Sequence, residues 1–90
     1  MAGPLEGFRV IDVCRAGPGQ QATGVLADYG ADVVTIVEPG YFSRRSIAGA
    51  EPVAEINRRN KRSLFLNLRA PGAADVFLRL AKESDAILES

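Results

Sequence analysis

"FRVIDVCRAGPGQQATGVLADYGADVVTIVE" (residues 8–38) decides the fold, because it reads as a strand, a glycine-rich turn, a helix and a second strand. We predict the first strand over Phe8–Cys14, where valine and isoleucine favour extended backbone. Apolar residues recur at three- and four-residue spacing over Gln20–Tyr29, which predicts a short amphipathic helix. Gly30 follows it, where a left-handed C-terminal cap is expected. The β-branched run 32–38 is typical of a strand covered on both faces in a parallel sheet.

A turn of Gly17, Pro18 and Gly19 separates the first predicted strand from the helix. Glycine tolerates unusual backbone angles and proline fixes φ, so we expect a tight turn here. A turn that leads into a helix N-terminus presents free backbone N–H groups and a partial positive charge. We therefore expect this turn to bind a phosphate, a carboxylate or a thioester oxygen.

The same turn also matches the dinucleotide fingerprint G-x-G-x-x-G/A, as "GPGQQA" over residues 17–22. Glu38, at the end of the second predicted strand, stands at the spacing of the acid that accepts a ribose hydroxyl. Two features weaken this interpretation, because Pro18 lacks an amide hydrogen and Gly24 falls inside the helix. A dinucleotide-binding module of an oxidoreductase remains an alternative at this point.

The second half of the chain continues the alternation of strands and helices. We predict a loop over 40–52, one or two helical turns over 53–60, a strand over 61–68, a helix over 70–84 and a strand over 85–89. Pro71 lies near the start of the last helix, and one face carries Ala74, Phe77, Leu78 and Ala81. This order favours right-handed βαβ units. The predicted fold class is therefore α/β, with a parallel sheet built from βαβ units.

The composition narrows the class of protein. Ninety residues form at most one small domain, and 47% hydrophobic with 24% charged residues is typical of a folded chain. Eleven basic and eleven acidic residues balance, so we expect neither nucleic acid nor a membrane as a partner. The single cysteine, Cys14, and the absence of a secretory pattern lead us to expect a cytoplasmic protein. Without histidine, Ser-His-Asp and Cys-His catalysis are excluded within this chain, and we expect no metal site.

Other polar residues have both a structural and a functional interpretation. We expect Cys14 to be a small buried hydrophobe rather than a nucleophile, since no base is near it in the sequence. The basic cluster "RRNKRS" (58–63) is either a solvated face or a contact for phosphates. Gln20 and Gln21 could hydrogen-bond an acyl carbonyl or cap the helix. Asp12 receives no chemical role from the sequence.

The last predicted strand runs up to Ser90, the end of the chain. A strand of a parallel sheet is normally followed by a loop and a covering element. We therefore interpret residues 1–90 as the N-terminal part of a larger domain. A complete ninety-residue α/β domain is the alternative.

Five blocks extend the pattern over nearly the whole chain: "PLEGFRVIDV" (4–13), "AGPG" (16–19), "LADYGADVV" (26–34), "NKRSLFLNLRAPG" (60–72) and "LAKESDAILE" (80–89). In order and spacing they resemble the N-terminal region of the family III CoA-transferases. That family includes formyl-CoA:oxalate transferases, carnitine-CoA transferases and α-methylacyl-CoA racemases. The glycine-proline-glycine turn is closer to the racemase-like branch, whereas "NKRS" is closer to the transferases.

The resemblance implies a Rossmann-like large domain whose first turn holds CoA rather than a nicotinamide cofactor. It places Ala16, Gly17 and Pro18 near the pantetheine and the thioester. It places Leu66 and Arg69 near the adenosine and the phosphates, and a guanidinium can pair bidentately with a phosphate. CoA or acyl-CoA would be a substrate, and no cofactor would be permanently bound.

The resemblance also implies an activity and partners. A family III enzyme moves CoA between carboxylic acids through acyl-CoA thioesters, with racemisation of a 2-methylacyl-CoA as the alternative. The expected partners are an acyl-CoA and a carboxylic acid acceptor, together with a second copy of the chain in an interlocked homodimer. The catalytic Asp is expected beyond Ser90, so the ninety residues alone should show no turnover.

Four residues depart from the family pattern. Family members usually carry Lys or Arg where Thr35 stands, an acid where Val37 stands, and often Arg or Pro where Glu38 stands. Asn67 replaces a common Asp. A basic residue at the position of Glu38 helps to bind CoA in those members. In this alignment we expect the carboxylate of Glu38 to repel the phosphates of CoA. The alternative is a one-residue slip near Val37, which would place Glu38 on the family acid.

Overall fold

A computed structural model describes residues 3–15, 17–38 and 59–90 of the chain. Within them the strands and helices are β1 (Arg9–Val13), α1 (Gly17–Asp28), β2 (Asp32–Val37), β3 (Lys61–Phe65), α4 (Ala73–Lys82) and β4 (Ala86–Glu89). The alternation of strands and helices confirms the predicted α/β class. The loop expected over 40–52 and most of the helical segment expected over 53–60 lie outside the described residues.

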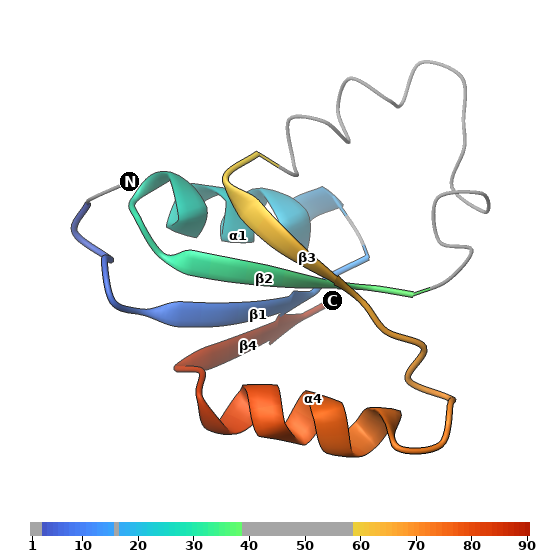
Figure 1. Cartoon of the computed structure of the whole chain (residues 1–90). Coiled ribbons are helices and arrows are strands. Elements are labelled where there is room, and N and C mark those ends of the chain that lie inside the picture. The colour runs from blue at the N-terminus through green and yellow to red at the C-terminus, as the bar shows by residue number, and fades with distance from the viewer. Residues whose placement is uncertain (1–2, 16, 39–58) are drawn as a thin grey trace.

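The four strands form one parallel sheet in the order β3-β2-β1-β4. The chain moves from β1 to β2 on one side, and after β3 it returns to place β4 on the other side of β1. Figure 1 shows α1 and α4 on opposite sides of the sheet. This is the start of a doubly wound sheet, and its strand order reverses between β1 and β4.

The core lies between the sheet and α1. Its buried cluster combines two strand valines with two alanines from α1 and its C-terminal end, namely Val10, Ala27, Ala31 and Val33. Side chains alternate along a strand, so Ile11 points to the opposite face, where α4 lies. Ile11 and Val33 are fully buried on these two faces. In β2 the adjacent residues Val33 and Val34 are both buried, so the prediction that the strand over 32–38 is covered on both faces is confirmed.

The predicted start of α1 is wrong by three residues. We expected the helix from Gln20, but it begins at Gly17 and includes Pro18 in its first turn. Proline fits there because the first N–H groups of a helix have no intrahelical acceptor. The predicted C-terminal cap is confirmed: Gly30 has a φ of 102° and its N–H donates to the carbonyl of Ala27.

The third strand and the second helix are shorter than predicted. β3 ends at Phe65 rather than at residue 68, because the chain turns where the N–H of Ala70 donates to the carbonyl of Asn67. The helix starts at Ala73, after Gly72 in a left-handed conformation with φ of 84°.

The apolar face predicted for this helix is confirmed in part. Ala73 is buried, whereas Ala74 and Leu78, both predicted on the apolar face, are exposed. Phe77 and Ala81 are half-buried, as a face turned partly toward the sheet requires.

Candidate functional site

All four parallel strands end at the same edge of the sheet, and α1 begins there. The strand order reverses between β1 and β4 at this edge, which is where doubly wound sheets bind their ligands. Gly19 makes the close approach of α1 possible. A Cβ on this residue would lie 2.6 Å from Sγ of Cys14 and 2.9 Å from Oγ of Ser90. Only glycine lets the first turn of α1 pack against the ends of both strands.

The N-terminus of α1 keeps its positive partial charge. Its first turn contains no acidic residue, and Pro18 contributes no N–H. The side-chain amide of Gln20 donates to the carbonyl of Cys14 at 3.4 Å, so it braces the turn against the end of β1. Within the first turn of α1, Gly17 and Gly19 carry the backbone N–H groups that an anionic or carbonyl ligand would meet, because the first N–H groups of a helix have no intrahelical acceptor.

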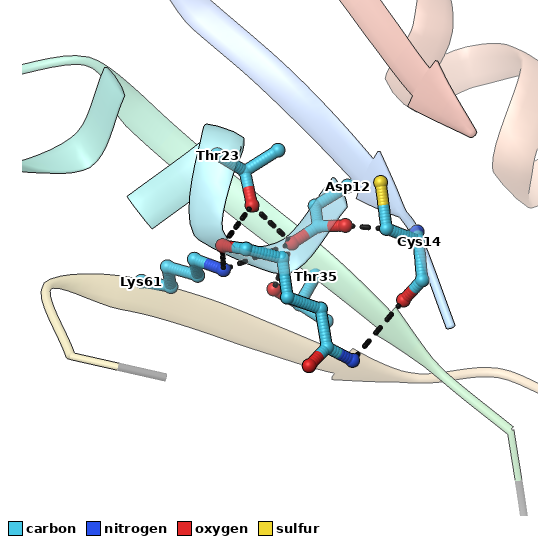
Figure 2. A network of polar contacts seen from close by, with 6 residues as sticks. Asp12, Cys14, Thr23, Thr35 and Lys61 are labelled. Carbon is cyan, nitrogen blue, oxygen red and sulfur yellow. Dashed lines mark hydrogen bonds and ion pairs between the residues drawn. The ribbon is translucent and has the colours of Figure 1, made fainter. Parts of the chain in front are cut away.

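Beneath this turn lies a buried polar network centred on Asp12 of β1 (Figure 2). Its Oδ2 accepts hydrogen bonds from Thr23 Oγ1 at 2.7 Å, Lys61 Nζ at 3.1 Å and Thr35 Oγ1 at 3.4 Å. Its Oδ1 accepts the backbone N–H of Cys14 at 2.8 Å. The network therefore joins three strands of the sheet to α1.

The same network reaches the first turn of α1. Lys61 Nζ donates to the backbone carbonyl of Gln20 at 3.0 Å, and Thr23 Oγ1 lies 3.1 Å from that carbonyl. Burial by itself raises the pKa of Asp12, but the hydrogen bonds from Thr23, Cys14 and Lys61 outweigh it. The pKa of Asp12 therefore lies below its ordinary value, and the carboxyl is ionised at neutral pH.

Cys14 is buried next to this network, and its backbone N–H donates to Asp12. Burial raises the pKa of its thiol, and the neighbouring Asp12 carboxylate raises it further. The thiol is therefore protonated at neutral pH and is a poor nucleophile. This agrees with the expectation that Cys14 packs as a small hydrophobe.

Glu38 does not face the edge as an unpaired acid. Its carboxylate forms an ion pair with the guanidinium of Arg15, so the residues that follow β1 and β2 are joined. This pairing reduces the repulsion of phosphates that the sequence led us to expect. The dinucleotide interpretation assigned this carboxylate to a ribose hydroxyl, but in the structure it is paired with Arg15.

The sequence-predicted contact residues fall into two groups along the edge. Gly17 is half-buried and Pro18 is exposed, both in the first turn of α1, and Ala16 lies outside the described residues. Leu66 directly follows β3, and its N–H donates to the carbonyl of Val37 at 2.9 Å. Arg69 is exposed in the next turn. The two groups are separated by β2, which corresponds to about 10 Å between β1 and β3.

The basic cluster at 58–63 binds acids of this chain, as far as it is described. Arg59 pairs with Asp28 at 2.6 Å, Lys61 with Asp12 at 3.1 Å and Arg62 with Asp32 at 2.6 Å. The sequence left open whether this cluster is a solvated face or a contact for phosphates. In the structure these three side chains form ion pairs with acids of the chain, and the Lys61 side chain is buried. Sequence reasoning missed the Asp12–Lys61 pair, although an aspartate inside a buried strand required a partner.

Two other classes of site are absent from residues 3–15, 17–38 and 59–90. No group of three or more Cys, Asp or Glu side chains there could hold a metal ion. No helix in these ranges has the length and apolar character needed to cross a membrane.

The doubly wound sheet, with a glycine-rich helix N-terminus at its switch point, defines the class of Rossmann-like α/β folds. Residues 5–90 match the family model of CoA-transferase family III. The chain belongs to that family, and the resemblance drawn from its five sequence blocks is confirmed.

Curated relatives include both transferases and a racemase. The chain is 38% identical to the probable fatty acyl-CoA transferase Rv3272 of Mycobacterium tuberculosis, over 99% of this chain and 24% of that protein. It is 40% identical to human alpha-methylacyl-CoA racemase over 94% of this chain and 20% of the racemase. It is 30% identical to an Escherichia coli formyl-CoA:oxalate CoA-transferase over 100% of this chain and 23% of that enzyme.

Solved structures agree in fold. The crystal structure of Rv3272 matches with a TM-score of 0.86 at 38% identity, covering 99% of this chain and 25% of that one. A CaiB/BaiF family protein from Brucella suis also matches with a TM-score of 0.86, at 25% identity, covering 99% and 26%. The chain therefore spans about a quarter of the length of the relatives that it matches.

Proposed function

We propose that these ninety residues supply the CoA-binding part of an enzyme that moves CoA between carboxylic acids through acyl-CoA thioesters. The observation that carries the proposal is the family match over residues 5–90, in a fold that places the N-terminus of α1 at the switch point of the sheet. CoA and acyl-CoA are substrates in this proposal, and no cofactor is permanently bound.

The geometry of the edge supports an extended ligand. Ala16, together with Gly17 and Pro18 of the first turn of α1, would contact the pantetheine and the thioester, where backbone N–H groups can bind a carbonyl oxygen. Leu66 would contact the adenosine, and the exposed guanidinium of Arg69 would bind a phosphate. The separation of about 10 Å between β1 and β3 suits a molecule that is long and flexible.

The catalytic group is proposed to lie beyond Ser90. Among the described residues, Asp12, Asp28 and Asp32 are all engaged in ion pairs with cations of this chain. Their pKa values are all lowered, which makes them poor proton acceptors. The partners proposed for the whole protein are a carboxylic acid acceptor and a second copy of the chain in an interlocked homodimer, in the cytoplasm.

Racemisation of a 2-methylacyl-CoA is the second candidate, favoured by the 40% identity to the human racemase. Both reactions bind an acyl-CoA thioester and differ in what happens to the acyl group. A transferase exchanges the carboxylate partner of CoA, whereas a racemase exchanges the α-proton with solvent. Incubation of 2-methylacyl-CoA in D₂O separates them, because deuterium enters C2 only if racemisation occurs.

Calorimetric titration of the full-length protein tests the binding proposal. We expect acetyl-CoA to bind and NADPH not to bind. Arg69→Gln should weaken acetyl-CoA binding about tenfold or more, since a hydrogen bond to a charged group contributes about 1.5–3 kcal/mol. The matched control is Arg79→Gln, an exposed arginine on α4. Binding of NADPH without acetyl-CoA would refute the proposal in favour of a dinucleotide module.

A further inference from the structure

The buried Asp12–Lys61 ion pair has no assigned role in the binding of acyl-CoA. The side chains are 1% and 3% exposed, and the two atoms lie 3.1 Å apart. A buried ion pair is commonly no more stabilising than apolar residues of similar volume, because both charges lose their hydration. The need for stability therefore does not by itself account for this pair.

The contacts of the pair point to one place, the junction between β1 and α1 (Figure 2). Asp12 accepts the backbone N–H of Cys14, which directly follows β1. Lys61 donates to the backbone carbonyl of Gln20, in the first turn of α1. Thr23, which lies beyond that turn, donates to the same carboxylate. Cys14 before the glycine-rich junction, and Gln20 and Thr23 within α1, are therefore all hydrogen-bonded to the Asp12–Lys61 pair.

We propose that Asp12 and Lys61 are positioning residues that hold the first turn of α1 in the orientation required to bind an acyl-CoA thioester. Neither side chain touches the ligand in this proposal. Lys61 fixes the Gln20 carbonyl, and this contact holds the first turn of α1, with its N-terminal N–H groups, at the edge of the sheet. This inference rests on the proposed function, because it concerns the helix N-terminus that would bind the thioester.

The strands also provide a matched control pair. Asp32 of β2 and Arg62 of β3 form an ion pair at 2.6 Å, with side chains 35% and 64% exposed. Lys61 and Arg62 are neighbours in one strand, so their side chains leave the sheet on opposite faces. Of these two, it is Lys61 that donates to α1. Asp32 also pairs with Arg9 of β1 at 2.9 Å, so the control removes the contacts of Asp32 with both neighbouring strands without touching the junction.

The test compares two double variants of the full-length protein. Asp12→Asn with Lys61→Met removes both buried charges together, so that no uncompensated charge is left inside. We expect this variant to fold and to bind acetyl-CoA at least tenfold more weakly than the unsubstituted protein in calorimetry. Asp32→Asn with Arg62→Met should bind acetyl-CoA within twofold of it. A merely structural role would lower the melting temperature and leave the Kd of the folded protein unchanged.

A folded Asp12→Asn/Lys61→Met variant with an unaltered Kd would overturn the proposal. If that variant does not fold, Thr23→Val provides the same comparison by removing only the hydroxyl that joins α1 to Asp12. If the unsubstituted protein does not bind acetyl-CoA, the proposed function fails separately. The positioning role is then tested without ligand by hydrogen exchange, and unchanged protection of residues 17–23 in the double variant would refute it.

Discussion

Asp12 is a charged residue with a fully buried side chain. Its pKa is nevertheless lowered, because the hydrogen bonds from Thr23, Cys14 and Lys61 and the positive charge of Lys61 outweigh the effect of burial. An aspartate with a lowered pKa in the folded state binds fewer protons than it does in the unfolded state. Its contribution to stability is therefore present above the ordinary value of about 3.9 and is lost as the pH falls through its folded-state pKa.

Because the ionised form of Asp12 stabilises the folded protein, we predict a pH-dependent effect of Asp12→Asn in the full-length protein. At pH 7 the substitution should lower the free energy of unfolding by about 3–5 kcal/mol, because Lys61 is left buried without its counter-ion. The loss should shrink steadily below about pH 4, where the aspartate of the unsubstituted protein becomes protonated as well. Urea unfolding between pH 7 and pH 3 measures this loss of stability. A loss that does not change with pH would contradict the lowered pKa of Asp12.

Sequence reasoning could not find this residue pair. Asp12 and Lys61 are 49 positions apart, and they meet only because β2 and β3 pair in the observed register. A buried strand with an aspartate indicates that some partner exists, but the chain offers several cations. Lys61 belongs to the basic cluster 58–63. Only the tertiary structure distinguishes it, as the buried partner of Asp12, from Arg59 and Arg62.

At the scale of the elements, α1 shows which parts of a helix the local sequence predicts and which parts it does not. Its apolar spacing and Gly30 predicted the body and the C-terminal end correctly. Its start was missed, because Gly17, Pro18 and Gly19 read as a turn in sequence although they are helical. The glycine-rich junction is predicted correctly at the end of the first strand, which is the edge of the sheet where doubly wound folds bind ligands.

Two glycines of α1 should respond in opposite directions to alanine. Gly19→Ala would place a Cβ 2.6 Å from Cys14 Sγ, and we expect it to cost about 1–3 kcal/mol through overpacking. A Cβ on Gly24 would meet no atom of the described residues within 4 Å beyond its chain neighbours and its own helix backbone. Gly24→Ala should therefore stabilise the helix by about 0.5–1 kcal/mol. Thermal unfolding of both variants measures the difference, and equal effects would show that the first turn of α1 is not closely packed.

At the scale of the whole molecule, the parallel α/β class followed from the alternation of patterns, but the strand order did not. The order β3-β2-β1-β4 depends on which side of β1 the chain returns to, and no local pattern records that choice. Several large apolar side chains of the described residues are exposed, among them Phe65, Leu78 and Ile87. The chain also spans about a quarter of its relatives' length, so its activity is a property to test on the full-length protein.

Hydrogen exchange of the full-length protein with and without acetyl-CoA tests the central claim, that the β1–α1 junction holds the thioester end of CoA. We predict slower exchange at residues 17–21, which open α1, and at residues 66–69, which follow β3. Exchange in α4 (Ala73–Lys82) should be unchanged and serves as the internal control. Saturating acetyl-CoA that leaves exchange at residues 17–21 unchanged while protecting other segments would contradict the account.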